Sequence, residues 1–381
     1  MFSGHPRGQS WHACCSFYGP VNLLDAVAAS MIRPPGDTRP ARLFKEVLDL
    51  EALVGQLEAD DAARAALLAA ARDRATVALE LAERQGLTAI SLVDERYSSW
   101  LREIVDPPSV LWVRGVIPPL SPPAERPVVA IVGSRQATPA GLQMGRWLAE
   151  GLAEAGLAVV SGLARGVDGT AHEGALASGG VTIGVLGCGA DVVYPSEHRD
   201  LAARVAASGG VVSEFPPGTA PLPHHFPLRN RIIAGLSRAV VVIEAGEKSG
   251  SLITAKMAME QGRDVLVVPG NVLSGRNRGG HALIKDGARL VESVDDVLAE
   301  IGMLGAARAG QVGTDGADNL MIDNELSKQM AIGETYDADT LAGLTGWDVS
   351  KLLSELARLE LGGQVSRLAG GWVRRAGRTR G

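Results

Sequence analysis

The sequence is poor in cysteine and aromatic residues, and it has no apolar run long enough to cross a membrane. Of the three cysteines, Cys14 and Cys15 are neighbours, which cannot form an ordinary disulfide without strain. Together with Cys188 they form neither a disulfide framework nor a C-x-x-C metal knuckle. The N-terminus lacks the charged-then-apolar pattern of a secretion signal. We therefore expect a protein of the reducing cytoplasm without a membrane segment.

Familiar catalytic signatures are also missing. The chain contains no G-x-S-x-G elbow, no H-E-x-x-H zinc motif and no Walker phosphate loop, and Cys188 has no obvious base near it in sequence. His224 and His225 are adjacent, which is a poor spacing for two ligands of one metal ion unless a loop carries them. We therefore expect no catalytic residues, no metal ion and no cofactor.

The charge balance excludes proteins that wrap a polyanion by bulk attraction. The formal net charge is −6, and residues 126–300 contain 16 Lys and Arg against 17 Asp and Glu. Contact with nucleic acid would have to come from a local cluster of cations. Hydrophobic residues make up 46% of the chain, and 47 glycines accompany only 4% aromatics. This mixture is typical of an α/β protein with many tight strand-to-helix turns.

From residue 128 onward, apolar β-branched runs alternate with helical segments. The alternation predicts a mostly parallel sheet that is covered by helices on both faces. The expected strands are Val128–Val132, Leu157–Ser161, Val181–Leu186, Gly210–Phe215, Ala239–Ile243 and Asp264–Val268. The expected helices lie near 138–155, 168–178, 197–207, 229–237 and 251–262.

Composition divides the chain into five parts. Residues 1–40 show no convincing periodicity and are predicted to be poorly defined or disordered, whereas 41–90 have the helical spacing of a small N-terminal domain. Residues 91–302 carry the α/β pattern, and the Gly- and Ala-rich stretch 303–319 is predicted to be a linker. Residues 320–381 have the order of a winged helix followed by a basic tail, with mixed charges on the expected recognition helix that favour a protein contact or an auxiliary DNA contact.

Glycine-rich turns follow several of the expected strands. They are Gly133-Ser134-Arg135, Ser161–Thr170, Gly250–Thr254 and Val268–Asn271. Open α/β sheets bind ligands at the carboxyl ends of their strands, where glycine lets a phosphate approach the backbone amides. Helix capping by Asp168 and Ser251 explains part of the pattern. No helix cap requires Arg135. It either contacts an anion or is simply a solvated arginine of the loop.

The segment His225–Ser237 places arginines where a helix normally carries acids. We predict Arg229 and Arg231 in the first turn of an apolar helix, beside the partial positive charge of its N-terminus. Two cations and unpaired amides at that place suit an anion that arrives from outside. Phe226 offers either a stacking face to a base or packing under its loop.

Together these motifs resemble the DNA-processing protein A family, also called Smf. The matching blocks span about 90–300 and are Gly133-Ser134-Arg135, Ser161-Gly162 with Gly166-Val167-Asp168, Tyr194-Pro195, His225-Phe226-Pro227 with Arg229–Ser237, Gly250–Ala255 and Pro269-Gly270. The resemblance implies an extended Rossmann-like domain that binds and protects single-stranded DNA. It also implies a homodimer, no catalysis, and help in loading the RecA recombinase during natural transformation and recombination.

Carried over position by position, the resemblance makes Arg135, Arg229 and Arg231 contacts of DNA phosphates. The whole set expected to bind DNA is Gly133, Ser134, Arg135, Gly162, Arg165, Gly166, His225, Phe226, Arg229, Asn230, Arg231, Gly250, Ser251 and Thr254. We expect replacement of Arg135 or Arg229 by alanine to weaken binding without unfolding the protein.

Two rival functions stay open at this point. One is a nucleotide-processing enzyme of the phosphoribohydrolase group, whose P-G-G-x-G-T-x-x-E signature is absent from the corresponding stretch Glu244–Thr254. The other is a transcription regulator that acts through the winged helix. Release of base from nucleoside monophosphates would indicate the first, and a footprint on duplex DNA the second.

Overall fold

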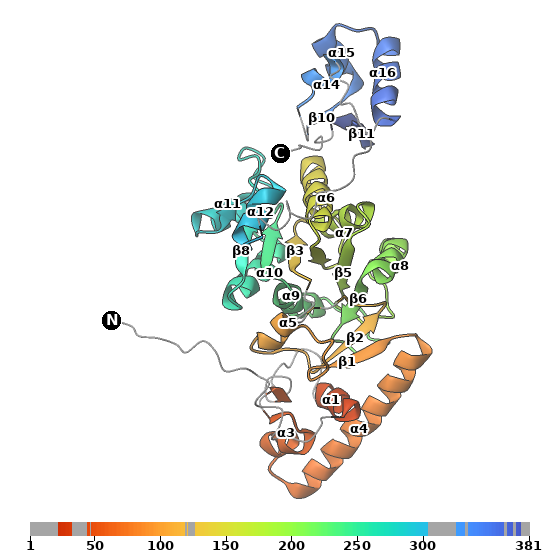
Figure 1. Cartoon of the computed structure of the whole chain (residues 1–381), viewed down its shortest axis with the longest axis vertical. Helices are drawn as coiled ribbons and strands as arrows, with labels where there is room; N and C mark the ends of the chain where they lie inside the picture. Colours follow the sequence, from red (N-terminus) through yellow and green to blue (C-terminus); the bar gives the residue numbers. More distant parts are fainter. Residues whose placement is uncertain are drawn as a thin grey trace, which may run out of the picture.

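The core of the protein is a nine-stranded sheet with the strand order β1-β2-β6-β5-β4-β3-β7-β8-β9 (Figure 1). The computed structural model describes residues 22–32, 44–45, 47–118, 120, 126–303, 325–331, 334–361, 364–368 and 371–374. The strands are β1 (Thr88–Ser91), β2 (Val110–Arg114), β3 (Val128–Val132), β4 (Ala158–Ser161), β5 (Val181–Val185), β6 (Gly210–Ser213), β7 (Ala239–Val242), β8 (Asp264–Val267) and β9 (Arg289–Leu290). From β6 to β9 every neighbouring pair is parallel, whereas β2 pairs antiparallel with β6 and β1 with β2. The predicted mostly parallel sheet is confirmed.

Helices cover both faces of this sheet, and the side chains of each strand alternate between them. On β3, Val128 and Ala130 pack into one hydrophobic cluster, while Val129 and Ile131 pack into another. The first face carries α5 (Ser99–Glu103), α9 (His225–Leu236) and α10 (Gly250–Glu260). The second carries α6 (Pro139–Glu154), α7 (Val167–Ala177) and α12 (Val294–Glu300), with α8 (Arg199–Ser208) beside α7. The unit also contains α11 (Arg278–Lys285), which lies between β8 and β9 in the chain.

Helix α9 begins four residues before the position predicted from the sequence. It starts at His225, so Pro227 lies inside its first turn, where the missing N–H of proline removes no helical hydrogen bond. Arg229 and Arg231 therefore occupy the fifth and seventh positions, and the prediction that they lie in the first turn is wrong. The sequence pattern alone did not indicate this start, because proline is also typical of the loop before a helix.

The N-terminal region contains the helices α1 (Leu23–Ser30), α3 (Leu50–Leu57) and α4 (Asp61–Arg84). Helix α1 lies within residues 1–40, for which the sequence showed no periodicity. Its four consecutive residues Ala26–Ala29 are all fully buried, so it lacks the polar face that produces a helical pattern. Cys14, Cys15, the predicted linker from 304 onward and the basic tail lie outside the described residues.

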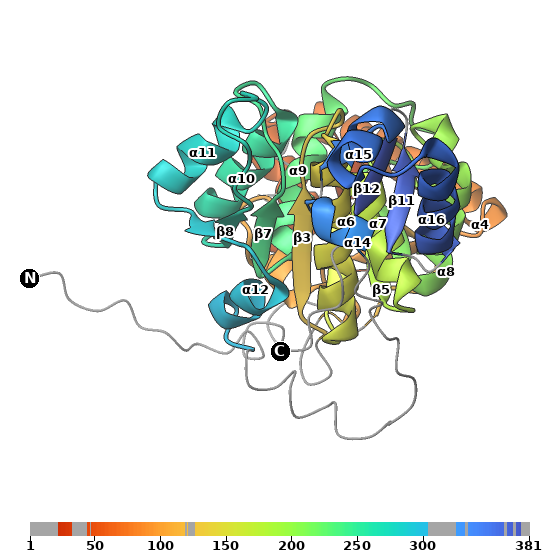
Figure 2. The same cartoon turned by 90° about the horizontal axis from the view of Figure 1, so that it is seen from above.

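The C-terminal region is a winged helix with its own hydrophobic cluster. It contains α14 (Glu325–Gln329), β10 (Thr335–Tyr336), α15 (Ala338–Thr345), α16 (Val349–Leu361), β11 (Val365–Leu368) and β12 (Gly371–Arg374). The amide of Gln143 donates to the backbone carbonyl of Arg374 at 3.0 Å, so β12 contacts the first half of α6 (Figures 1 and 2). Among the described helices, none has both the length and the apolar character of a membrane span.

A buried histidine beneath the sheet gives the fold a predictable sensitivity to acid. The hydroxyl of Thr182 donates to the carbonyl of Val159, so Nδ1 of His172, 2.7 Å from that hydroxyl, carries the ring proton. Burial, with a smaller electrostatic contribution from His198 and Arg229, lowers the pKa of His172 from 6.5 to about 3. At acidic pH the unfolded chain therefore binds a proton at His172, whereas the folded protein does not.

As the pH falls from 6.5 to about 3, we expect His172 to lower the free energy of unfolding by about 1.4 kcal/mol per pH unit. The reason is that the unfolded state binds more protons than the folded state in this range. Urea denaturation across this range should give a steeper loss for the wild type than for His172→Gln. Equal slopes in the two proteins would contradict a neutral buried imidazole.

Candidate functional site

The turns that follow β3 and β4 are locked together at the carboxyl edge of the sheet. The backbone N–H of Val167 donates to the carbonyl of Ser134 at 3.2 Å. Gly166 has a φ of +78°, and a Cβ atom there would lie 2.2 Å from that same carbonyl oxygen. Glycine at 166 thus permits both the turn and the close approach. The contact places Arg135, which is exposed, directly over the start of α7.

Arg135 belongs to a surface of one cation and two aromatic rings. Its guanidinium carbon lies 5.5 Å from the ring centroid of Phe226, and the ring of Tyr194 lies 5.4 Å from that of Phe226 at an interplanar angle of 42°. A Cβ atom on Gly187 would lie 3.0 Å from the Phe226 ring, so this glycine makes room for it. Tyr194 is 42% exposed and was not among the predicted site residues, although an exposed tyrosine in a family motif was a usable signal. We name Arg135, Phe226 and Tyr194 the cation–aromatic surface.

Arg229 lies beneath this surface and is almost fully buried, with 3% of its area exposed. Its Nη1 donates to the carbonyls of Gly162, at 2.7 Å, and of Val185, which join the ends of β4 and β5. A Cβ atom on Gly162 would lie 2.6 Å from the guanidinium, so the glycine is needed for that contact. Burial lowers the pKa of Arg229 to about 10, and the nearby Asp168 opposes this shift.

Asp168 serves Arg229 and the β4 turn rather than capping α7 as predicted. The N-cap of α7 is Gly166, and Oδ2 of Asp168 reaches back to accept from the N–H of Gly162 at 3.1 Å. Burial raises the pKa of Asp168, while the charge of Arg229 acts in the opposite direction. The predicted cap by Ser251 is also wrong, since Ser249 precedes α10 and accepts from the N–H of Ser251.

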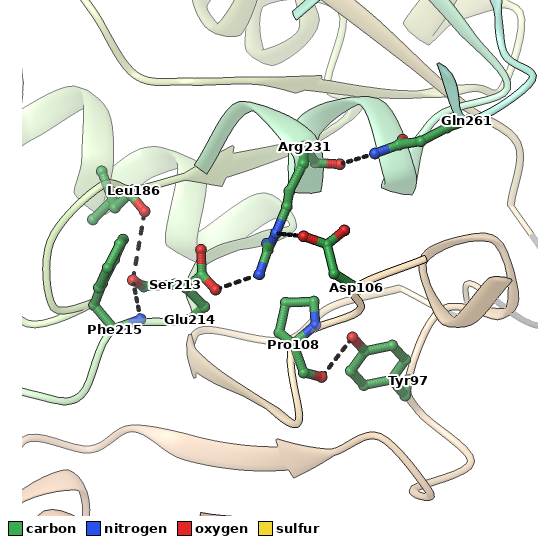
Figure 3. Close-up of polar contacts among 9 residues, drawn as sticks. All are labelled: Tyr97, Asp106, Pro108, Leu186, Ser213, Glu214, Phe215, Arg231 and Gln261. Atoms are coloured by element: carbon green, nitrogen blue, oxygen red, sulfur yellow. Dashed lines mark hydrogen bonds and ion pairs between the residues drawn. The ribbon is translucent and has the colours of Figure 1, made fainter. Parts of the chain in front are cut away.

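Arg231 points into a different buried network, between Asp106 and Glu214 (Figure 3). Its Nε lies 3.1 Å from Oδ2 of Asp106, and its Nη2 lies 2.6 Å from Oε2 of Glu214. Burial raises the pKa of Glu214, and Arg231 opposes that change. Arg231 is 5% exposed and ties the segment before β2 to α9 and the end of β6.

The predicted site residues as a whole divide into exposed and buried groups. His225 is 1% exposed and stacks on Phe215, with ring centroids 4.1 Å apart. The side chain of Asn230 accepts from Nε of Arg229 and donates to the carbonyl of Gly250. The positions with exposed or partly exposed surface are Gly133, Ser134, Arg135, Arg165, Gly166, Phe226 and Gly250; those that are buried are Gly162, His225, Arg229, Asn230, Arg231, Ser251 and Thr254.

Glu244, just after β7, supports the turn of Arg135 in a way that the sequence did not reveal. Its carboxylate accepts from the hydroxyl of Thr138 at 2.6 Å and from the backbone N–H of Thr138 at 3.1 Å. The carbonyl of Glu244 accepts from the N–H of Ser134 at 2.7 Å. Glu244 thus supplies the anion at the N-terminus of α6, and it fixes the turn that carries Arg135.

Two observations concern metal binding and nucleophilic chemistry at this edge. Within the described ranges, no group of three or more His, Cys, Asp or Glu side chains is placed to hold a metal ion. Burial raises the pKa of Cys188 to about 11, so its thiol stays protonated at neutral pH and is a poor nucleophile.

Comparison with known proteins identifies the relatives of this chain. A sequence model of the DNA recombination-mediator protein A family matches residues 88–302, and one of the DprA winged helix domain matches 331–371. Protein Smf of Escherichia coli is 40% identical over 252 residues, which are 65% of this chain and 67% of that protein. The DNA processing protein DprA of Streptococcus pneumoniae is 51% identical over 174 residues, which are 46% of this chain and 61% of that one.

The X-ray structure of DNA processing protein A from Streptococcus pneumoniae has a similar fold, with a TM-score of 0.63 and 36% identity. The superposition covers 73% of this chain and 98% of that one. In sequence, the match spans about two thirds of the Escherichia coli relative and about three fifths of the Streptococcus pneumoniae relative.

Proposed function

This chain belongs to the DNA recombination-mediator protein A family, and we propose on that basis that it binds and protects single-stranded DNA and helps to load the RecA recombinase onto it. The observation that carries the proposal is the cation–aromatic surface at the carboxyl edge of the sheet. A guanidinium that contacts a phosphate beside two rings that stack on bases is the usual means of holding a single strand without reading its sequence.

Within this proposal the arginines of the site have different tasks. Arg135 contacts a phosphate directly, since it is exposed and lies over the ring of Phe226. Arg229 holds the turns of β4 and β5 in place below it, and Arg231 holds the segment before β2. The glycines at 133 and 166 let the two turns pack against each other, since Cβ atoms there would meet Val167 and the carbonyl of Ser134. Arg165 adds a second exposed cation, although it is paired with Glu197.

Binding should favour single strands and weaken steeply with salt, because release of counterions from the phosphates contributes to the affinity. The test is a titration of labelled single-stranded and duplex oligonucleotides at two salt concentrations, followed by RecA filament assembly on strands coated with a single-strand-binding protein. Equal affinity for both forms of DNA would contradict the proposed site. Failure to speed filament assembly would contradict the loading function alone.

Replacing Phe226 by leucine is expected to weaken single-strand binding about tenfold, because stacking of a base on an aromatic ring is worth roughly 1–3 kcal/mol. Leucine retains the apolar volume beneath the loop. Tyr194→Leu should have an effect of the same kind, since its ring adjoins Phe226. Fluorescence anisotropy with a labelled oligonucleotide measures both.

The control for this pair is Phe44→Leu, which removes the same ring from the buried core of the N-terminal region and should leave DNA affinity unchanged. If Phe226→Leu behaves like this control, Phe226 only packs under its loop.

We also propose that the protein is a non-catalytic homodimer of the cytoplasm. Its domains in this proposal are those predicted from the sequence, with the α/β unit at 91–302 and the winged helix at 320–381.

The phosphoribohydrolase alternative is not favoured, because the family match is to recombination mediators. In the winged helix, the guanidinium of Arg358 pairs with Glu355 at 2.5 Å, so the recognition helix suits an auxiliary contact better than sequence-specific reading of a duplex.

A further inference from the structure

An exposed ion pair lies close to the cation–aromatic surface. Nε of Arg165 donates to Oε1 of Glu197, and the two side chains are 62% and 46% exposed. This hydrogen bond raises the pKa of Arg165 and lowers the pKa of Glu197, so both groups are charged at neutral pH. In the free protein the charge of the second exposed cation of the site is therefore neutralised by an acid.

Arg165 lies on the route of a strand that crosses this surface. Its turn is locked to the turn of Arg135, because the N–H of Val167 donates to the carbonyl of Ser134 at 3.2 Å. Besides the larger effect of the ion pair, the nearby phenol of Tyr194 also raises the pKa of Arg165. A strand that contacts Arg135 and stacks on the ring of Tyr194 thus passes the guanidinium of Arg165.

The fold holds Glu197 opposite this guanidinium. Glu197 is the middle residue of the short 3-10 helix η2 (Ser196–His198). Nδ1 of His198 lies 2.9 Å from the carbonyl oxygen of Leu163, in the turn after β4. Gly169 makes room for this ring, since a Cβ atom there would lie 3.0 Å from Cε1 of His198. The segment that carries the acid is thus anchored to the turn that carries the cation, and the fold itself brings the two charges together.

We propose that Glu197 is a competing anion that limits the affinity of the site and speeds release of the strand. A phosphate displaces Glu197 from Arg165 when the strand binds, and the displaced carboxylate then lies unpaired beside the phosphates and repels them. The inference rests on the proposed single-strand binding and adds a control of release to it. Rapid release suits a protein that passes its strand to a recombinase.

The exchange of one anion for another has a signature in the salt dependence of binding. The phosphate that reaches Arg165 releases its counterion, but the displaced Glu197 takes one up, so the slope of log affinity against log salt hardly changes. Without the charge of Glu197 this compensation is lost. The slope should then become steeper by about 0.7, the value for one phosphate contact on a single strand.

The test compares the wild type with Glu197→Gln, which retains the shape of the side chain and loses its charge. Fluorescence anisotropy measures the affinity for oligothymidylate at several salt concentrations, and stopped flow measures dissociation. We expect the affinity to rise about threefold to tenfold, because the cation no longer has to leave its partner and a like charge is removed. Slower dissociation should account for most of the gain.

Two further variants distinguish this exchange from a general effect of charge. In an Arg165→Gln background, Glu197→Gln sets no cation free, so the gain in affinity should shrink and the salt slope should not steepen. The matched control is Asp61→Asn, which removes the acidic partner of the exposed Arg64 at the start of α4. It should change neither the affinity nor the dissociation rate.

The outcomes separate this inference from the proposed function. If the wild type binds oligothymidylate but Glu197→Gln binds no more tightly, Glu197 does not compete with phosphate, and only the inference is overturned. The same holds if the salt slope steepens equally without Arg165. If the wild type does not bind oligothymidylate, the proposed function is wrong and the inference falls with it.

Discussion

Replacing Arg231 by alanine is expected to lower the free energy of unfolding by about 3–5 kcal/mol, because it leaves buried carboxylates without their cation. Glu214 and Asp106 both depend on this guanidinium, and Glu214 lies deep enough for burial to raise its pKa. The network joins the segment before β2 to α9 and to the turn after β6 (Figure 3). Urea denaturation at neutral pH, followed by tryptophan fluorescence, measures the loss.

A triple variant provides the control for this experiment. Arg231→Met combined with Glu214→Met and Asp106→Asn removes all three charges, and it should recover much of the lost stability because no charge is left unpaired. The prediction from the sequence was that Arg231 contacts DNA. That prediction would be supported if Arg231→Ala changes stability by less than about 1 kcal/mol and strongly weakens binding of single strands.

Replacing Arg135 by alanine should have the largest effect on binding. We expect single-strand affinity to fall by about 2–3 kcal/mol, or roughly 30- to 150-fold, because a hydrogen-bonded contact between charges is lost at the centre of the site. Stability should change by less than about 0.5 kcal/mol, since the side chain is exposed. The slope of log affinity against log salt should become shallower by about 0.7, the value for one phosphate contact on a single strand.

Arg84→Ala is the matched control, because it removes one cation from an exposed position at the end of α4. It should leave both the affinity and the salt slope unchanged. Equal affinities for the wild type and Arg135→Ala would show that the phosphate path lies elsewhere on the protein.

The contrast between Arg135 and Arg229 shows how far the sequence could predict the site. Both follow from the family motifs, and both were expected to weaken binding without unfolding when replaced. In the structure, Arg229 donates to two backbone carbonyls from a position that is 3% exposed, so we now expect Arg229→Ala to destabilise the protein as well. A sequence motif shows that a position requires arginine. It does not show whether that arginine contacts a phosphate, as proposed for Arg135, or holds the turns of β4 and β5, as Arg229 does.

By itself the sequence determined the six strands β3 to β8 and the helices α6 to α10 between them. The alternation of apolar runs and helical segments depends on residues close together in the chain. The same is true of the glycine pattern, which predicts a binding site at the carboxyl edge. Only the tertiary structure decided which cations reach that edge. The partners of Arg231 lie 125 and 17 residues away in the chain, and those of Arg229 lie 67 and 44 residues away. Exposure of a charge depends on such distant contacts, because a buried guanidinium is stable only where acceptors from other segments meet it.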